Sequence, residues 1–378
     1  MDIKQKNLLQ KGEPALGSIY GKEEVIMANR SFKESMDPSV GFLDDKEAKD
    51  FETDFLNLRD CKYAVALNSA GAALDLVLSA LSIKPGDEII SCAINFPGTH
   101  LAIIRSGAKL VLCEPDPMTL NIDSYDVKKR LSKKTKAIVV THMNGLAAET
   151  DLLKEIVNSY KYFKEEKPKI ICDAARACGT TYKGHHVGKG VWATIFSFDT
   201  KKTITTLGRG GMVVTDDREL SDKLQNLGSN YKITKIQAAV GRVQLKKLKR
   251  MVNLRRARAE ERHWAFSSFP QIYIQKDSVN SRNSYYLYTM ILPENSHGLK
   301  RDKLKNALQD NYGIGCVVAN PPTYKSNKLI KAHTKGQRLP LSDNLGNRIL
   351  CPCIHPAITK ETNKYIINAF IKNFETIF

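Results

Sequence analysis

The sequence predicts an α/β fold, with a mostly parallel sheet flanked by helices and a smaller α+β domain after it. Two observations support this fold class. Through residues 63–215, short apolar segments typical of buried strands alternate with longer segments of helical periodicity. Beyond about residue 263 that alternation ends, and short strand-like segments accompany two helix-like ones. We therefore expect a large domain over residues 1–250, including an N-terminal arm, and a small C-terminal domain over residues 251–378.

The alternation predicts seven strands in the first part of the chain. The expected strands are residues 63–67, 88–92, 110–113, 137–141, 170–173, 193–198 and 212–215. The expected helices are residues 23–35, a segment within 41–60, and 72–81, 99–107, 126–131, 151–160, 218–227 and 236–264. Helices between strands predict crossover connections that place helices on both faces of the sheet. The polar segment before residue 20 is expected to be an arm that is loose or packs on a partner.

The C-terminal part has a different pattern of short apolar segments. The expected strands there are residues 273–277, 285–292 and 314–320, and the expected helices are residues 301–309 and 360–374. A mixed sheet with helices on one face fits this order. The helix over residues 236–264 would link the two domains.

The charge of the chain is high. Its 378 residues include 58 basic and 40 acidic ones, which gives a formal net charge of +18. Such a charge fits nucleic-acid binding, steering of an anionic substrate, or lysines on solvated faces. The lysines are spread along the whole chain, and no zinc-finger or RNA-recognition signature is present. We favour solvated lysines, with some help to a phosphorylated substrate, and expect no nucleic-acid partner.

The location and the metal content follow from what the sequence lacks. No apolar run is long enough to cross a bilayer, and the N-terminus has no apolar signal core. The expectation is a cytoplasmic protein with no membrane partner. Most of the eight cysteines lie within apolar runs, and none has the spacing of a zinc site. Neither a metal nor a disulfide framework is therefore expected.

Side chains at two expected strand ends indicate a particular cofactor. Asp173 closes an apolar run, and Lys201 and Lys202 follow the strand 193–198 in a polar turn. Ligands of open α/β sheets bind at the carboxyl ends of the strands. Pyridoxal phosphate is held by a lysine Schiff base and needs a carboxylate on its pyridinium nitrogen, so this pair is typical of its site. The alternative is a lysine-rich solvated hairpin in an unrelated protein.

A phosphate site is expected just after the first strand. Ser69, Ala70 and Gly71 form a turn of small residues between that strand and a helix N-terminus. Free backbone N–H groups and the helix dipole favour an anion at such a turn. This signal is weak by itself, because every strand–helix unit has a turn of this kind. Ser197, five positions before Lys202, offers a further hydroxyl to the phosphate.

Together these motifs resemble the DegT family of sugar aminotransferases. The motifs are DAAxAxG at 173–179, SFxxxK at 197–202 and LGxGGxVVTDD at 207–217, and the resemblance runs through most of the chain. It implies a fold-type-I pyridoxal phosphate enzyme that moves an amino group from an amino acid, usually L-glutamate, to a keto sugar, usually a nucleotide-linked one. The family's lysine stands five residues after the serine. That spacing selects Lys202 as the Schiff-base lysine, with Asp173 on the ring nitrogen.

The resemblance implies further contacts with the cofactor. Phe96 would stack on the ring, with an ordinary core aromatic as the alternative. Asn230 would reach the phosphate of the neighbouring subunit, which implies a homodimer with shared active sites. Ala70 and Gly71 replace the family's glycine and threonine, so a hydroxyl is lost while the backbone cradle remains. Arg176 replaces the usual glutamine or histidine beside the phenolic oxygen; it would stabilise the phenolate, bind a substrate anion, or form a structural salt bridge.

Three other functions stay open at this point. Some proteins of this fold are sugar dehydratases in which the lysine is replaced, commonly by histidine, and Lys202 argues against that reaction. A non-catalytic regulatory protein on the same fold is kept open by the residues at 70, 71 and 176. A nucleic-acid-binding protein rests on the charge alone. The sugar, the carbon that is aminated and the amino donor are not determined by the sequence.

Overall fold

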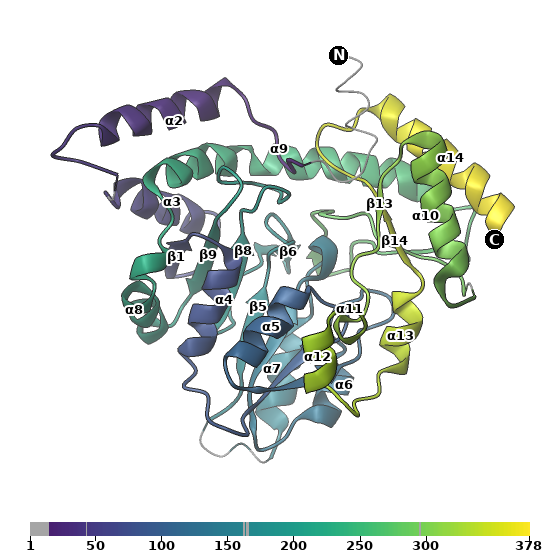
Figure 1. Ribbon diagram of the computed structural model, residues 1–378, viewed down its shortest axis with the longest axis horizontal. Helices are drawn as coiled ribbons and strands as arrows, with labels where there is room; N and C mark the ends of the chain where they lie inside the picture. Colours follow the sequence, from purple (N-terminus) through teal and green to yellow (C-terminus); the bar gives the residue numbers. More distant parts are fainter. Residues whose placement is uncertain (1–14, 43, 162, 164–165, 295) are drawn as a thin grey trace.

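The computed structural model describes residues 15–378 except 43, 162, 164–165 and 295, so most of the expected N-terminal arm lies outside the described residues. The large sheet has seven strands in the order β1-β9-β8-β5-β4-β2-β3 (Figure 1). They are β1 (Tyr63–Leu67), β2 (Glu88–Cys92), β3 (Lys109–Cys113), β4 (Thr135–Thr141), β5 (Lys169–Asp173), β8 (Ala193–Ser197) and β9 (Gly211–Thr215). Neighbouring strands are parallel except at β9, which is antiparallel to both β1 and β8. The predicted mostly parallel sheet is confirmed.

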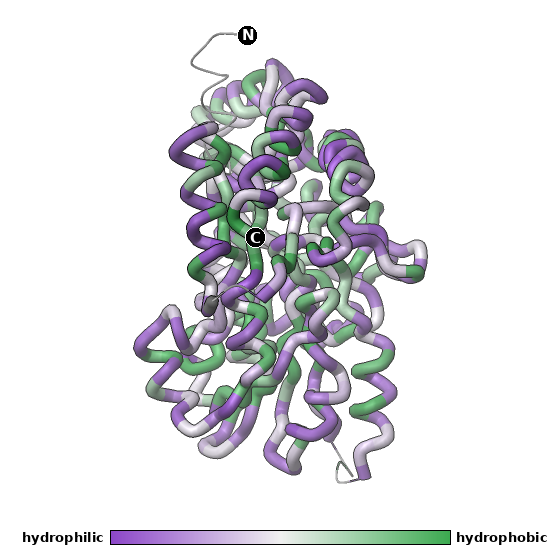
Figure 2. The backbone as a smooth tube through the Cα atoms, turned by 90° about the vertical axis from the view of Figure 1, so that its right-hand side faces the viewer, coloured by the Kyte–Doolittle hydropathy of each residue, from purple (hydrophilic) through white to green (hydrophobic). Residues whose placement is uncertain are grey.

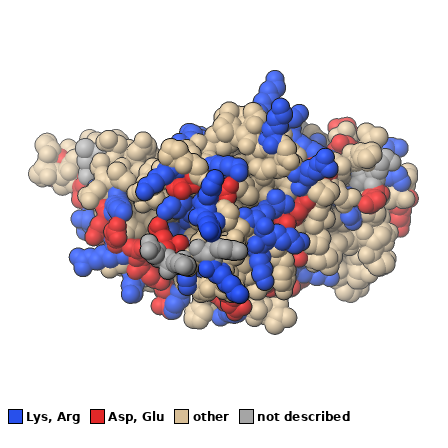
Figure 3. Space-filling model, turned by 90° about the horizontal axis from the view of Figure 1, so that it is seen from below, with Lys and Arg blue, Asp and Glu red and all other residues tan. Residues whose placement is uncertain are grey.

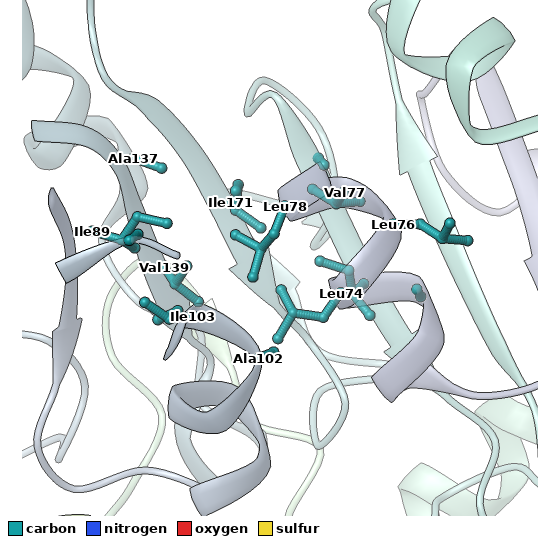
Figure 4. Packing of buried hydrophobic residues seen from close by; sticks show 14 of the residues in the cluster. Leu74, Leu76, Val77, Leu78, Ile89, Ala102, Ile103, Ala137, Val139 and Ile171 are labelled. Carbon is teal, nitrogen blue, oxygen red and sulfur yellow. The ribbon is translucent and has the colours of Figure 1, made fainter. Parts of the chain in front are cut away.

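Helices cover both faces of this sheet, because successive residues of a strand point to opposite sides. Helices α4 (Ala70–Ser79), α5 (Pro97–Arg105) and α8 (Arg218–Leu227) contribute to one apolar cluster. On the opposite face lie α3 (Lys46–Leu56), α6 (Ser124–Arg130), α7 (Thr150–Ser159) and α9 (Lys235–Ala265). On the first face, Leu74 of α4 and Ile103 of α5 pack against the sheet residues Ile89, Val139 and Ile171 (Figure 4). Each of these buried side chains contributes about 1.5–3 kcal/mol to the hydrophobic stabilisation.

The helix starts follow local capping signals in the sequence. The Ser69 hydroxyl accepts the N–H of Ala72 at 3.1 Å, so α4 begins directly after it. The predicted start at residue 72 is therefore wrong by one half-turn, because the small-residue turn is itself the first turn of the helix. Asp217 caps α8 in the same way through the N–H of Leu220. These caps fix the direction in which each helix leaves its strand.

The C-terminal part contains a four-stranded antiparallel sheet in the order β10-β12-β14-β13. Its strands are β10 (Tyr273–Ile274), β12 (Met290–Ile291), β13 (Cys316–Val317) and β14 (Ile349–Pro352). Helices α10 (Leu299–Tyr312) and α14 (Lys360–Ile377) share one apolar cluster with this sheet. Figure 2 shows hydrophobic and hydrophilic residues alternating along the outer helices, as expected for helices with one buried face.

The predicted strand over residues 285–292 is wrong for most of its length, since only Met290–Ile291 pairs as a strand. Tyr285 has a φ of 49°, in the left-handed region that interrupts extended backbone. The carbonyls of Tyr285 and Tyr286 accept from the guanidinium of Arg255. The N–H of Leu287 donates to Asn144. Hydrogen bonds to the Arg255 side chain and to the loop at Asn144 thus replace the hydrogen bonds of a strand. The irregular segment brings Tyr286 to the cavity of the large sheet.

The remaining elements lie outside the two larger sheets. They are α2 (Lys22–Ser35), β6 (Thr181–Tyr182), β7 (His185–His186), β11 (Ser281–Arg282), α11 (Thr323–Ser326), α12 (Lys328–His333), α13 (Pro340–Gly346) and the 3₁₀ turns η1 (Met143–Gly145), η2 (Ser229–Tyr231) and η3 (Ser296–Gly298). Strands β6, β7 and β11 form a third sheet. Helix α9 runs along both regions (Figure 1). Ile330 and Leu339, from the C-terminal part, pack in the cluster of the large sheet, and the domain boundary at residue 250 stays a prediction.

Basic side chains on the surface are interspersed with acidic ones (Figure 3). On the face shown in Figure 3, groups of lysine and arginine side chains alternate with acidic ones. Several lysines are paired, for example Lys136 with Glu166 and Lys109 with Glu88. This mixture fits solvated lysines on that face. No helix in the described part of the chain combines the length and the apolar character needed to cross a bilayer.

Candidate active site

A cavity of about 440 Å³ opens at the carboxyl ends of the central strands. Thr141, Asp173 and Ser197 line it, and each is the last residue of its strand, β4, β5 or β8. The N-terminal turns of α4 and α5 close another side. The cavity also contains Ala70, Gly71, Phe96, Arg176, Lys202 and Tyr286. All the predicted site residues except Asn230 are therefore brought together.

Asp173 presents a buried carboxylate to this cavity. Its side chain accepts the hydroxyl of Thr99 at 2.9 Å and the N–H of Ala175 at 3.0 Å. Asp173 is only 9% exposed. Among the described residues, no lysine or arginine lies within ion-pair distance of it. A buried carboxylate held by neutral donors still requires a cation, and a protonated ring nitrogen supplies one.

The turn before α4 offers free backbone donors. The Ser69 hydroxyl oxygen accepts the N–H of Ala72 and so caps α4, while the N–H groups of Ala70 and Gly71 have no acceptor among the described residues. Gly211, the first residue of β9, packs against this turn so closely that a Cβ would lie 2.5 Å from the carbonyl carbon of Ser69. Glycine is required there by space. The cradle of N–H groups at a helix start fits a phosphate.

The two neighbouring lysines differ in their surroundings. Lys201 is exposed, whereas Lys202 is half-buried. The Nζ of Lys202 lies 4.9 Å from the centre of the Tyr286 ring. Its backbone N–H donates to the carbonyl of Asp199 at 2.9 Å, which fixes the turn after β8. The environment therefore favours Lys202 as the reactive amine, in agreement with its spacing from Ser197.

A contact that the sequence did not indicate holds this lysine turn from outside. The N–H of Gly17 donates to the carbonyl of Thr200 at 2.8 Å, and the Thr200 hydroxyl donates to Ala15 at 2.6 Å. A Cβ at Gly17 would lie 2.1 Å from the carbonyl oxygen of Lys201. The Tyr20 hydroxyl bonds to Thr205 in the same loop. Residues 15–20, expected to be loose or on a partner, thus cover the lysine turn.

Arg176 and Tyr286 form a second group in the cavity. Nη1 of Arg176 donates to Oδ1 of Asn144 at 2.6 Å, and Nη2 donates to Oδ1 of Asn320 at 3.2 Å. Cζ of Arg176 lies 5.7 Å from the centre of the Tyr286 ring. The same ring thus contacts both Arg176 and Lys202. Tyr286 and Asn320 both come from irregular C-terminal backbone, so no local sequence pattern places them at the site.

Phe96 and Ser197 lie where the predictions need them. Phe96 is 57% exposed at the start of α5, and its ring lies directly over Gly98, where a Cβ would be 2.4 Å from the ring. It is therefore not a core aromatic. Ser197 is buried at the end of β8, and its Oγ accepts the N–H of Asp199 at 3.4 Å.

Asn230 and His142 lie outside the cavity. Asn230 is exposed in η2 and does not line the cavity of its own chain. His142, a strand-end histidine, is buried and accepts the N–H of Ala148 at 3.0 Å, while burial lowers its pKa to about 4. It is a neutral structural residue.

These features together fit pyridoxal phosphate. Asp173 has the position and the uncompensated charge for the ring nitrogen, and the unpartnered N–H groups of Ala70 and Gly71 suit the phosphate. Lys202 has the amine for covalent attachment, and the exposed ring of Phe96 offers a flat apolar surface. The residues present can therefore hold each part of the group.

Known proteins share both the sequence pattern and the fold. Residues 27–371 match the model of the DegT/DnrJ/EryC1/StrS aminotransferase family. The chain is 32% identical over 335 residues to the spore coat polysaccharide biosynthesis protein SpsC of Bacillus subtilis (strain 168), covering 81% of this chain and 82% of that protein. It is 29% identical over 339 residues to the GDP-perosamine synthase of Escherichia coli O157:H7, covering 85% and 89%. The aminotransferase from Psychrobacter cryohalolentis has the same fold, with a TM-score of 0.85 and 26% identity over 95% of this chain and 98% of that one.

The similarities confirm the predicted family, fold class, reaction and cofactor. Because the family model spans most of the chain, this chain belongs to the DegT/DnrJ/EryC1/StrS aminotransferase family and is a sugar aminotransferase with pyridoxal phosphate as its cofactor.

Proposed function

We propose that this enzyme transfers the amino group of an amino acid, L-glutamate in the first instance, to a keto sugar linked to a nucleotide. The observation that carries the proposal is the pairing of Asp173 and Lys202 across one cavity, beside the free N–H groups of Ala70 and Gly71. This set of groups matches the ring nitrogen, the aldehyde and the phosphate of one cofactor. A relative whose name, GDP-perosamine synthase, contains a nucleotide supports the nucleotide linkage.

The proposed roles follow from the contacts. Bound pyridoxal phosphate supplies the electron sink for the bond that breaks at the donor's α-carbon. Lys202 would hold the cofactor through Nζ, and the same amine would move the proton at that carbon. The Asp173 carboxylate keeps a proton on the ring nitrogen, and Thr99 with Ala175 fixes its orientation. Ser69, Ala70, Gly71 and Ser197 hold the phosphate, and Phe96 covers the ring.

The nucleotide would contact basic side chains on the exposed side of the cavity. Arg105, Lys201 and Arg209 line the cavity on its exposed side. Arg105 is paired with Asp75, and Arg209 lies 3.7 Å from Asp199, so both are only partly neutralised at the surface. Exposed cations of this kind attract the phosphates of a nucleoside diphosphate.

The test compares keto sugars with and without the nucleotide. The enzyme is first aminated with glutamate, and the return of the lysine-bound cofactor band is then followed after addition of each sugar. The proposal expects turnover of a nucleoside-diphosphate keto sugar and a lower kcat/KM for it in Arg209→Ala. Equal turnover of the free keto sugar, unaffected by Arg209→Ala, would contradict the nucleotide linkage. Failure of every amino acid to aminate the cofactor would contradict the donor.

A homodimer with shared sites is part of the proposal. Asn230 is exposed outside its own cavity, and the apolar side chains of Leu227 and Tyr231 beside it are 50% and 45% exposed. An asparagine amid exposed apolar residues suits a surface that meets a second copy. Mixing the inactive variants Lys202→Ala and Asn230→Ala should restore roughly a quarter of the active sites, since each mixed dimer has one intact pair. No recovery in mixed dimers would contradict sharing.

A cytoplasmic location remains a prediction of the sequence.

A further inference from the structure

Arg176 is a cation that the cavity does not neutralise. It is half-buried, and no carboxylate among the described residues lies within ion-pair distance of it. Its hydrogen-bond partners are all neutral: the carboxamide oxygens of Asn144 and Asn320 and, at 3.9 Å, the sulfur of Met143. A guanidinium held by neutral acceptors keeps its full charge for a ligand. The alternative of a structural salt bridge for Arg176 is therefore excluded for the described chain.

The other cations of the cavity are placed differently. Arg105 donates to both oxygens of Asp75, at 2.7 and 3.0 Å, and its side chain is 56% exposed. Arg209 is 76% exposed, and Lys201 is exposed as well. Lys202 is committed to the cofactor under the proposed function. Arg176 is thus the inner cation that remains for an anionic group of a substrate.

The group around Arg176 contains a second hydrogen-bond donor that has no acceptor. Nδ2 of Asn320 is buried and has no hydrogen-bond partner, while its Oδ1 accepts from Arg176. Asn144, the other residue that accepts a hydrogen bond from Arg176, has a φ of 56°. Its Nδ2 donates to Thr289 in the C-terminal part at 2.9 Å. Buried polar groups without a partner mark places where a ligand or water completes the structure. Here the missing acceptor lies next to an uncompensated positive charge.

We propose that Arg176 and Asn320 bind the carboxylate of the amino-acid donor, an assignment that rests on the proposed function. A carboxylate has two oxygens and can accept from the guanidinium and from the Asn320 amide together. The phenolic oxygen of the cofactor, which the resemblance assigns to this position, offers one acceptor atom where a carboxylate offers two. The keto sugar carries no carboxylate. The donor, its keto-acid product and the sugar all enter the same cavity. The charge of Arg176 therefore favours binding of the donor and the keto acid, which carry a carboxylate, over the sugar.

The experiment measures carboxylate binding without the reaction. The holoenzyme is titrated with glutarate, a dicarboxylate that has no amino group to transfer, and the Kd is measured by calorimetry. Arg176→Gln should weaken glutarate binding by about tenfold or more, as expected for loss of a charge-assisted pair. Arg176→Lys should fall between, because a point charge lacks the planar fork. Asn320→Ala should weaken binding a few-fold, and the matched control Arg218→Gln, which alters an exposed arginine of α8 outside the cavity, should leave the Kd unchanged.

A second readout separates this role from a contact with the cofactor. The pH midpoint of the cofactor's absorbance band should be the same in Arg176→Gln as in the unaltered protein. A shifted midpoint with unchanged glutarate affinity would overturn the proposal in favour of the phenolic oxygen. If Arg176→Gln does not fold, as judged from its Tm, the Arg176→Lys and Asn320→Ala affinities decide in the same way. A protein that forms no cofactor band at all overturns the proposed function instead, which is a distinguishable result.

Discussion

The large sheet and the C-terminal region both bring side chains to the cavity, but by different kinds of backbone. Asp173 and Ser197 come from the last residues of buried five-residue strands. Tyr286 and Asn320 come from irregular segments that lie next to strands of only two residues. A strand end inside a packed sheet fixes a side chain firmly, whereas irregular backbone held by side-chain bonds adapts more readily. The difference suggests that the reaction depends on the large sheet, and that the C-terminal region adds Tyr286 and Asn320 to the recognition of the substrate.

The largest effect is expected at the lysine after β8. Lys202→Ala removes both the covalent anchor and the proton carrier, so kcat should fall by about 10³-fold or more. Lys201→Ala is the matched control, since Lys201 is exposed and one position away, and kcat for glutamate amination should change less than about threefold. Equal losses in the two variants, measured by stopped-flow absorbance, would show that the burial of Lys202 does not define its role.

A second loss is expected at the acid of β5. Asp173→Asn keeps the size, and its Oδ1 can still accept the N–H of Ala175 while its Nδ2 donates to the Thr99 hydroxyl, but it removes the charge that holds a proton on the ring nitrogen. The rate of donor amination should fall by about 10²–10⁴-fold, with cofactor still bound. Thr99→Val, which removes one orienting bond, should cost less. Single-turnover rates measure both, and an Asp173→Asn enzyme of near-normal rate would contradict the assignment.

A smaller effect is expected from the C-terminal region. Tyr286→Ala removes the ring that lies against both Lys202 and Arg176. Cation–π contacts of this kind contribute about 0.5–2 kcal/mol, so KM for the donor should rise by about tenfold while kcat changes less. Tyr286→Phe keeps the ring and serves as the control. A Phe variant as impaired as the Ala variant would assign the role to the hydroxyl instead of the ring face.

The smallest expected effect is on stability and comes from Glu52, a residue of α3 that contacts β1. Burial raises the pKa of Glu52 to about 7, and its carboxylate accepts the N–H of Ala66 at 2.7 Å. Because the folded-state pKa is raised, the contribution of this group to stability is full below its ordinary pKa and is lost as the pH rises through about 7. Glu52→Gln should therefore raise Tm at about pH 8, by an amount worth about 1–3 kcal/mol, and have little effect at about pH 5. A constant Tm difference across that range in thermal melts would contradict the raised pKa.

The same contrast explains what the sequence could predict. Strands with apolar runs and polar exits, such as those ending at Asp173 and Ser197, have local signals, and so does the small-residue turn after Leu67. Gly17, Thr99 and Tyr286 reach the site through contacts between distant parts of the chain. No local pattern marks such contacts. The strand expected at 285–292 failed because partners from Arg255 and η1 replace a ladder there.

The central claim is that Lys202, held against Tyr286 and opposite Asp173, is the residue that carries the cofactor. The most direct measurement is reduction of the holoenzyme with borohydride, followed by mass spectrometric mapping of the labelled lysine. The account predicts one cofactor-derived group per chain, located on Lys202 and absent from the Lys202→Ala variant. A label on Lys201, or a protein that binds no cofactor covalently, would contradict it.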